Sequence, residues 1–280
     1  MWLIDSLTQQ QLATSDTPVD VLSFDAFAMA LGSTRATASG WVDTAGVHLV
    51  AASTSGVTGG ESLVYSSASA RGSFGDEFVL SSPTHAVGSS GTARVAFSIT
   101  GDLSGAAYGG GGFDDGLGGG AAASWQASFQ LYGQNDGVQW EGSQGRSFES
   151  SGNDILTGDA QPGIRYFDVP VVFGDTLWLS IGATVEARSG AQAVYAGPGK
   201  AGGEALAAFF STMAWGGVIS LTDGQGGAVM DFSALSASTG FDYRQAYAAP
   251  VPEPATGVLL LAGLLVLALA ARRRSRPARS

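Results

Sequence analysis

The sequence lacks cysteine altogether and has a single lysine, Lys200, and two histidines, His48 and His85, among its 280 residues. Without cysteine the chain has no disulfide, no cysteine-ligated zinc site and no thiol nucleophile. Charged residues make up only 13% of the chain. Up to residue 250 there are eight basic against 23 acidic residues. This acidic balance argues against nucleic acid or anionic lipid as partners, because both require a basic patch.

Glycine is abundant, with 42 residues, and 45% of the chain is hydrophobic. So much glycine disfavours a mainly helical fold, because each interior glycine costs a helix about 1 kcal/mol. The hydrophobic content is too high for a wholly disordered chain. A β architecture with many turns satisfies both observations.

Apolar and polar residues alternate with period two in several segments, which is typical of half-buried strands. The clearest are 124–131, with Trp125 and Phe129 on the apolar side, and 177–186, with Leu179 and Ile181 there. Further expected strands are 21–31, 47–52, 63–66, 78–81, 95–99, 164–173, 218–221 and 229–232, and 205–210 forms either a helical turn or a strand. We therefore predict one all-β domain over residues 1–249, an antiparallel β-sandwich of jelly-roll type.

The C-terminal 31 residues have a different composition. Val251-Pro252-Glu253-Pro254 precedes residues 255–271, which contain no charge, and Arg272, Arg273 and Arg274 begin a basic tail. A helix over 255–271 would be roughly 25 Å long, nearly enough to cross a bilayer core of about 30 Å. The arginines place its C-terminal end in the cytoplasm by the positive-inside rule. Residues 250–280 are thus predicted to form a separate membrane-anchoring unit.

This order of elements resembles the PEP-CTERM sorting signal of Gram-negative bacteria. The resemblance rests on Pro252, Glu253 and Pro254, the apolar segment from Ala255 and the arginine cluster. It implies an inner-membrane precursor that an exosortase-type enzyme cuts at the Pro-Glu-Pro motif. The alternative is a plain single-pass anchor. A Gram-positive sortase signal would need Leu-Pro-x-Thr-Gly, and a GPI signal would end without basic residues.

The first 20 residues do not form a signal peptide, because no basic region precedes an apolar run and Asp5 interrupts the one candidate. An exported protein requires such a signal. Our hypothesis is that the start is misassigned or that the gene is truncated.

The sequence contains only weak signals for calcium binding or for a nucleotide-binding glycine motif. Residues 152–159 resemble one turn of a calcium-binding RTX repeat, but a single copy lacks its stacked partner, so an Asn-Asp turn entering a strand is expected. Asp154 and Asp159 are weak calcium candidates, followed by Asp114 and Asp115. The glycine-rich stretch 108–121 is expected to be a loop, since no helix follows it.

His48 and His85 lie in no catalytic motif, and we expect each at the surface or at a strand edge. Four glutamates could serve as acid and base for glycoside hydrolysis, but nothing in the sequence orders them into a pair. They are Glu141, Glu149, Glu186 and Glu204.

Two tryptophans are candidates for stacking on sugar rings. Trp178 is out of register with Leu177 and Leu179, and Trp140 lies between Gln139 and Glu141, so both are expected on a ligand-facing side. Trp125 is expected in the core.

The sequence as a whole predicts an exported structural or adhesive protein of the cell surface or extracellular matrix, with a non-catalytic ectodomain and no cofactor. The resemblance implies exopolysaccharide or biofilm as its setting. The alternatives are a carbohydrate-binding module and a secreted polysaccharide-degrading enzyme.

Overall fold

The computed structural model describes residues 4–5, 21–29, 32–58, 62–109, 117–133, 137–193 and 200–246. Side chains are described from residue 32 onward, except 210–212. By its internal contacts the chain divides into two units, Met1–Tyr247 and Ala248–Ser280. All described residues belong to the first unit.

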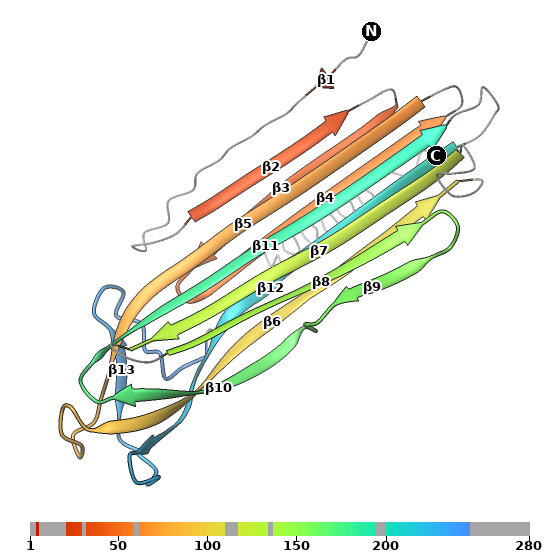
Figure 1. Cartoon of the computed structure of the whole chain (residues 1–280). Helices are drawn as coiled ribbons and strands as arrows, with labels where there is room; N and C mark the ends of the chain where they lie inside the picture. The colour runs from red at the N-terminus through yellow and green to blue at the C-terminus, as the bar shows by residue number, and fades with distance from the viewer. Residues whose placement is uncertain are drawn as a thin grey trace, which may run out of the picture. The chain divides into compact units, whose positions relative to one another are not determined.

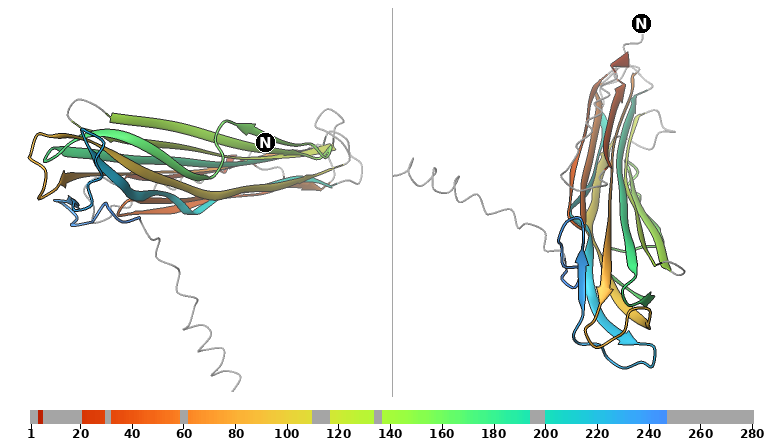
Figure 2. Two further views of the ribbon diagram at one scale, coloured as in Figure 1. Left: turned by 90° about the horizontal axis from the view of Figure 1, so that it is seen from below. Right: turned by 90° about the vertical axis from the view of Figure 1, so that its left-hand side faces the viewer.

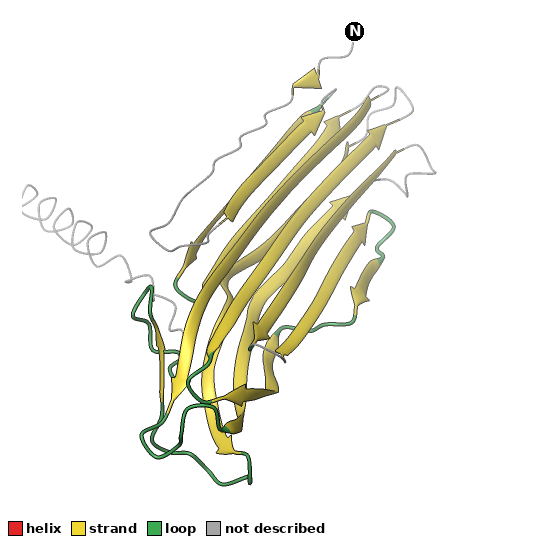
Figure 3. Ribbon diagram, turned by 60° about the vertical axis from the view of Figure 1, so that its left-hand side comes forward, coloured by secondary structure: helices red, strands yellow, loops and turns green. Residues whose placement is uncertain are grey.

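The described residues form strands and connecting loops, with no helix among them (Figure 3). No membrane-spanning helix occurs in these ranges, and the segment predicted to cross the membrane, 255–271, lies outside them. The all-β prediction is confirmed. The strands are β1 (Ile4–Asp5), β2 (Val21–Met29), β3 (Ser33–Asp43), β4 (Gly46–Thr58), β5 (Ser62–Ser81), β6 (Ser90–Tyr108), β7 (Leu117–Tyr132), β8 (Gly137–Glu149), β9 (Asp154–Gly158), β10 (Gly163–Val172), β11 (Thr176–Ala193), β12 (Lys200–Asp223) and β13 (Ser233–Ser236).

Two antiparallel sheets lie face to face (Figures 1 and 2). Among the described strands, the large sheet has the order β1-β2-β5-β11-β7-β8-β9, with β13 also paired to β5. The small sheet has the order β10-β6-β12-β4-β3. The antiparallel sandwich is therefore as predicted, while the jelly-roll type stays a prediction.

Several strands are longer than the alternation indicated. The expected short strands 63–66 and 78–81 are the two ends of one strand, β5, because the Ser/Ala/Gly residues between them continue the ladder with β11. The segment 205–210 is strand, inside β12. The glycine-rich stretch 108–121 was expected to be a loop throughout, but its last residues, from Leu117, already belong to β7.

The strand expected at 229–232 is wrong. In the structure Val229 closes a tight turn by donating its N–H to the carbonyl of Leu221, and the next strand begins only at Ser233. Ala228 forms an isolated bridge with Thr222 at the end of β12, and Val229 is buried, but the pairing does not continue along 229–232.

The core between the sheets changes character along its length. One end is aromatic, with Phe129 stacked on Phe97 and Phe167 at centroid distances of 5.2 and 5.1 Å. At the other end the sheets approach so closely that a Cβ on Gly203 of β12 would overlap the carbonyl oxygen of Gly120 on β7. Small residues are therefore required at this end, which explains part of the high glycine content.

The segment after β12 is fastened to the large sheet by a buried carboxylate. Asp76 on β5 is 4% exposed, and its Oδ1 accepts hydrogen bonds from the hydroxyls of Ser236 and Ser238 at 3.0 and 2.6 Å. Its Oδ2 accepts from the hydroxyls of Thr239 and Tyr243. One side chain thus gathers four hydroxyl donors from the last described part of the chain, in addition to the pairing of β13 with β5.

Candidate functional site

The outward face of the large sheet carries a continuous area of polar side chains. The alternation that buries Phe129, Leu179 and Ile181 turns their neighbours outward, and strand pairing aligns these neighbours in rows. We call the area the polar platform. Its rows cross β5, β11, β7 and β8 in that order: Glu77, Trp178, Tyr132 and Gly137; Gly75, Ser180, Gln130 and Gln139; Ser73, Gly182, Ser128 and Glu141; Arg71, Thr184, Gln126 and Ser143; Ser69, Glu186, Ser124 and Gly145.

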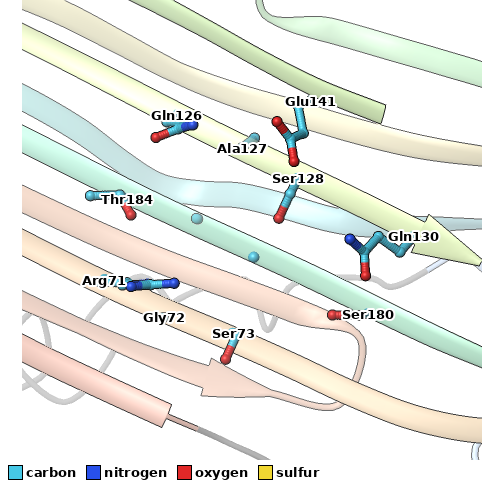
Figure 4. Close-up of a pocket in the computed structure, with 12 residues that line it drawn as sticks. Arg71, Gly72, Ser73, Gln126, Ala127, Ser128, Gln130, Glu141, Ser180 and Thr184 are labelled. Carbon is cyan, nitrogen blue, oxygen red and sulfur yellow. The ribbon is translucent and has the colours of Figure 1, made fainter. Parts of the chain in front are cut away.

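A shallow pocket of about 400 Å³ lies in the middle of the polar platform (Figure 4). Hydroxyl and amide groups line it, and Arg71 and Glu141 stand on opposite sides. Arg71 is paired in the ladder through its backbone, and its side chain is exposed. The pocket therefore offers many hydrogen-bonding groups and one charge of each sign.

A second depression, of about 450 Å³, shares Gln126 and Thr184 with the first and extends to Thr157 on β9. Its carboxylate, Glu186, accepts a hydrogen bond from Nε of Arg188 at 2.6 Å. This pairing with Glu186 raises the pKa of Arg188. The charges of this part of the platform are thus mutually neutralised.

One end of the polar platform is aromatic. Trp178 is 39% exposed and lies directly opposite Tyr132 in the ladder. The hydroxyl of Tyr132 donates to Oε1 of Gln139 at 3.1 Å, and Nε2 of Gln139 donates to Glu141 at 3.2 Å. An exposed indole therefore stands next to an ordered chain of polar groups, an arrangement suited to the apolar face and hydroxyl rim of a sugar.

Trp140, the second predicted stacking residue, lies on the other side of the sheet. It is half-buried, its ring lies 5.9 Å from that of Phe97 in the small sheet, and Arg165 covers it with the guanidinium 5.9 Å from the ring centroid. The structure therefore does not bring Trp140 and Trp178 together. Trp125 is buried in the core, as expected.

The two weak calcium candidates lie at the ends of the short edge strand β9: Asp154 is its first residue and Asp159 follows its last. As expected, a turn precedes this strand. Both carboxylate oxygens of Asp154 accept hydrogen bonds from Arg146, at 2.8 and 2.7 Å, and these bonds lower the pKa of Asp154. Asp159 accepts a weak hydrogen bond from the N–H of Ser143. The described residues hold no group of three or more potential metal ligands, and Asp114 and Asp115 lie outside them.

The four glutamates do not form a pair. Glu141 and Glu186 are on the same face, but they lie two strands and four residues apart, roughly 17 Å between their backbone positions. Acid and base of a glycosidase lie within about 10 Å. Glu149 is held by Ser151 and Asn153, and Glu204 is on the small sheet.

The expectation for His48 is wrong, because this side chain is fully buried. Trp41 lies opposite it in the ladder and covers it, with stacked rings 4.5 Å apart. His85 does lie in a loop, where its ring stacks on Phe173 and its Nε2 is 3.7 Å from Asp223.

Most residues of the polar platform belong to no recognisable sequence motif. Arg71, Gln126, Tyr132 and Thr184 belong to no sequence signature. Their only signal is that each occupies the polar half of an alternating strand, which marks the outward face and does not say which outward faces lie side by side.

The sorting residues Val251, Pro252, Glu253 and Pro254 and the cluster Arg272, Arg273 and Arg274 lie outside the described residues. Comparison with known proteins tests the resemblance that they carry. No curated protein matches the chain. Residues 250–274 match the family model of the PEP-CTERM protein-sorting motif. The resemblance drawn from the Pro-Glu-Pro residues is thereby confirmed: the chain carries the PEP-CTERM protein-sorting motif, which marks an exported protein sorted through its C-terminal signal.

Proposed function

We propose that this protein is a structural or adhesive component of the cell surface or extracellular matrix. Its ectodomain acts without catalysis and needs no cofactor, and it holds matrix polysaccharide on the polar platform. In the precursor, residues 255–271 cross the inner membrane once, with Arg272, Arg273 and Arg274 on the cytoplasmic side. An exosortase-type enzyme then cuts at Pro252–Pro254 and releases the ectodomain.

The observation that carries the proposal is the polar platform itself. Its hydroxyl and amide groups are spread over four strands, so it matches a long, flat ligand better than a small substrate held at one point. Glu186 is paired with Arg188, and Arg71 stands across the pocket from Glu141. A locally balanced surface of this kind suits a neutral, hydroxyl-rich polymer, because charge contributes little to either partner.

A protein partner fits this surface less well. The cores of protein–protein interfaces are enriched in aromatic and large apolar side chains. Apart from the row of Trp178 and Tyr132, the polar platform consists of glycine, serine, threonine, glutamine and three charged residues. Nor do backbone groups in the interior of a sheet remain free to pair with an added strand. Polysaccharide binding is therefore the adhesive mode that the geometry favours.

The binding part of the proposal is tested with the full chain in detergent and the neutral polysaccharide of the source cell's matrix, coupled to beads. We expect retention that falls about tenfold in Trp178→Ala, from loss of ring stacking. Tyr166→Ala is the matched control, since Tyr166 is also an exposed aromatic residue but lies on β10 of the small sheet. Equal retention of Trp178→Ala and wild type would contradict the assignment of the platform.

The sorting part is tested by mapping C-terminal peptides of the protein from the surface fraction of its native cell. We expect the mature chain to end near Glu253 to Thr256, without the arginine tail. An intact Arg279-Ser280 end found only in membranes would make the protein a permanently anchored one and would overturn the processing claim.

A further inference from the structure

A separate groove of about 290 Å³ lies beyond the far end of the polar platform, on the same outward face. Its axis is a single row of the ladder: Tyr65 on β5, Gly190 on β11, Gly120 on β7 and Glu149 on β8. The two glycines have no side chains, so the row forms a floor between Tyr65 and Glu149. We call this the tyrosine slot.

The walls of the tyrosine slot are already positioned. Tyr65 is 38% exposed, so its ring is open to a ligand. Glu149 is held by the hydroxyl of Ser151 and the amide of Asn153, at 3.0 and 2.8 Å to Oε2. Both groups are of the kind that bind sugars. A sugar ring in the slot would stack on the Tyr65 ring, and its hydroxyls would donate hydrogen bonds to the Glu149 carboxylate.

The charges of the tyrosine slot select a neutral ligand. Arg188 lines the slot but is paired with Glu186, so Glu149 is the charge left to face an occupant. An anionic sugar would be repelled by this carboxylate. A second copy of the chain is also disfavoured, because two acidic surfaces of net charge −11 per chain repel each other.

The tyrosine slot and the aromatic end of the platform share one strand. Trp178 and Gly190 are both on β11, twelve residues apart, which corresponds to roughly 40 Å along the strand. Every row between them contains outward-facing polar side chains, with glycine or alanine at some positions. A chain that binds at both ends would therefore lie along β11 and contact hydrogen-bonding groups over its whole length.

We propose that Trp178 and the tyrosine slot are the two ends of one extended site for a neutral polysaccharide, so that the protein selects long chains over short oligosaccharides. This inference rests on the proposed function. Long polysaccharides are selected because, once one end of the polymer is bound, binding of the second end is intramolecular and takes place at a high effective concentration. A short oligosaccharide reaches only one end and gains nothing from the other.

The test measures affinities of the full chain in detergent for the neutral matrix polysaccharide and for short oligosaccharides made from it by partial acid hydrolysis. We expect the polymer to bind on the order of 100-fold more tightly per chain. Tyr65→Ala should lower polymer affinity about tenfold, and Tyr65→Phe, which keeps the ring, should restore it. Tyr166→Ala is again the matched control and should bind as wild type does.

Three outcomes are distinguishable. If polymer and oligosaccharides bind equally and Tyr65→Ala behaves as wild type, the extended site is overturned while polysaccharide binding stands. If Tyr65→Ala loses polymer affinity while Tyr65→Phe keeps it, and both variants keep oligosaccharide binding at the Trp178 end, the inference is supported. If neither ligand binds the wild-type protein, the proposed function itself fails.

Discussion

The hydroxyl of Tyr243 donates a 2.7 Å hydrogen bond to Oδ2 of Asp76, although 167 residues separate the two along the chain. The ring of Tyr243 stacks on Phe78, 4.4 Å away, and its carbonyl accepts the indole N–H of Trp215 at 2.8 Å. Burial and the neighbouring carboxylate raise the pKa of Tyr243 far above its ordinary value, so the hydroxyl keeps its proton. This contact joins the end of the described domain to the middle of the large sheet.

We expect Tyr243→Phe to lower the free energy of unfolding by about 1–3 kcal/mol, because it removes one donor from a buried carboxylate and leaves the ring in place. Urea unfolding followed by tryptophan fluorescence measures this. Tyr166→Phe is the control: its side chain is 52% exposed, and its change should stay within about 0.5 kcal/mol. Equal effects of the two substitutions would show that the Asp76 contact does not stabilise the fold.

The stabilisation from Asp76 should depend on pH. Burial alone would raise the pKa of this carboxyl, but hydrogen bonds from Ser238, Tyr243, Ser236 and the N–H of Glu77 outweigh burial and lower it below the ordinary 3.8. As pH falls, Asp76 therefore becomes protonated in the unfolded chain before it does in the folded one. Its contribution to the free energy of unfolding is full above about pH 3.8 and is lost as pH falls through the lower pKa of the folded state.

We accordingly expect Asp76→Asn to destabilise the protein most at neutral pH, with a difference from wild type that narrows below about pH 4. Thermal unfolding across pH 2.5 to 7, run on both proteins, measures the difference. Subtracting the stability of the variant from that of the wild type at each pH removes the titration that both proteins share. This includes Asp154, Asp223 and Asp242, whose pKa values are also lowered. A difference that stays constant with pH would mean that the Asp76 charge contributes nothing.

Close approach of the two sheets should make Gly203 intolerant of a side chain. Its Cβ would overlap the backbone of Gly120 in the facing sheet, so Gly203→Ala should destabilise by about 1–3 kcal/mol through overpacking. Gly182→Ala is the control, since there the added carbon meets only the hydroxyl of Ser128, at 2.7 Å, and that hydroxyl is able to rotate away. Similar melting temperatures for the two variants would contradict the close approach.

Two buried serines on β4 should respond in opposite ways to alanine. Ser53 Oγ bonds to the hydroxyls of Ser66 and Ser189 at 2.7 and 2.8 Å, so Ser53→Ala should cost about 1–3 kcal/mol. Ser55 Oγ is buried and has no hydrogen-bond partner among the residues that the structure describes, so Ser55→Ala should be neutral or stabilising. Urea unfolding of the two variants measures both free energies of unfolding. Destabilisation by Ser55→Ala would contradict the prediction, because it would mean that the Ser55 hydroxyl has a hydrogen-bond partner.

Local pattern predicted a large part of the fold. Alternation placed Trp125, Phe129 and Ile181 in the core and Trp178 outside, because strand geometry sends successive side chains to opposite faces. It did not predict that β5 runs unbroken from Ser62 to Ser81, since the inward positions Ala68, Ala70 and Gly72 are small and give the alternation little hydrophobic contrast. Nor did it reveal that Trp41 covers His48, which depends on the pairing of β3 with β4.

The sequence by itself determined the C-terminal sorting motif and the all-β class. A linear motif such as Val251 to Pro254 is recognised from consecutive residues, and period-two alternation is likewise a property of neighbours along the chain. Tertiary structure alone decided which outward-facing residues of different strands lie side by side. Arg71, Thr184 and Gln126 form one row, and Asp76 meets Tyr243, only because long-range pairing of β5, β11, β7 and β13 fixes their register. Register is set by packing of the whole sandwich, and no local stretch of sequence encodes it.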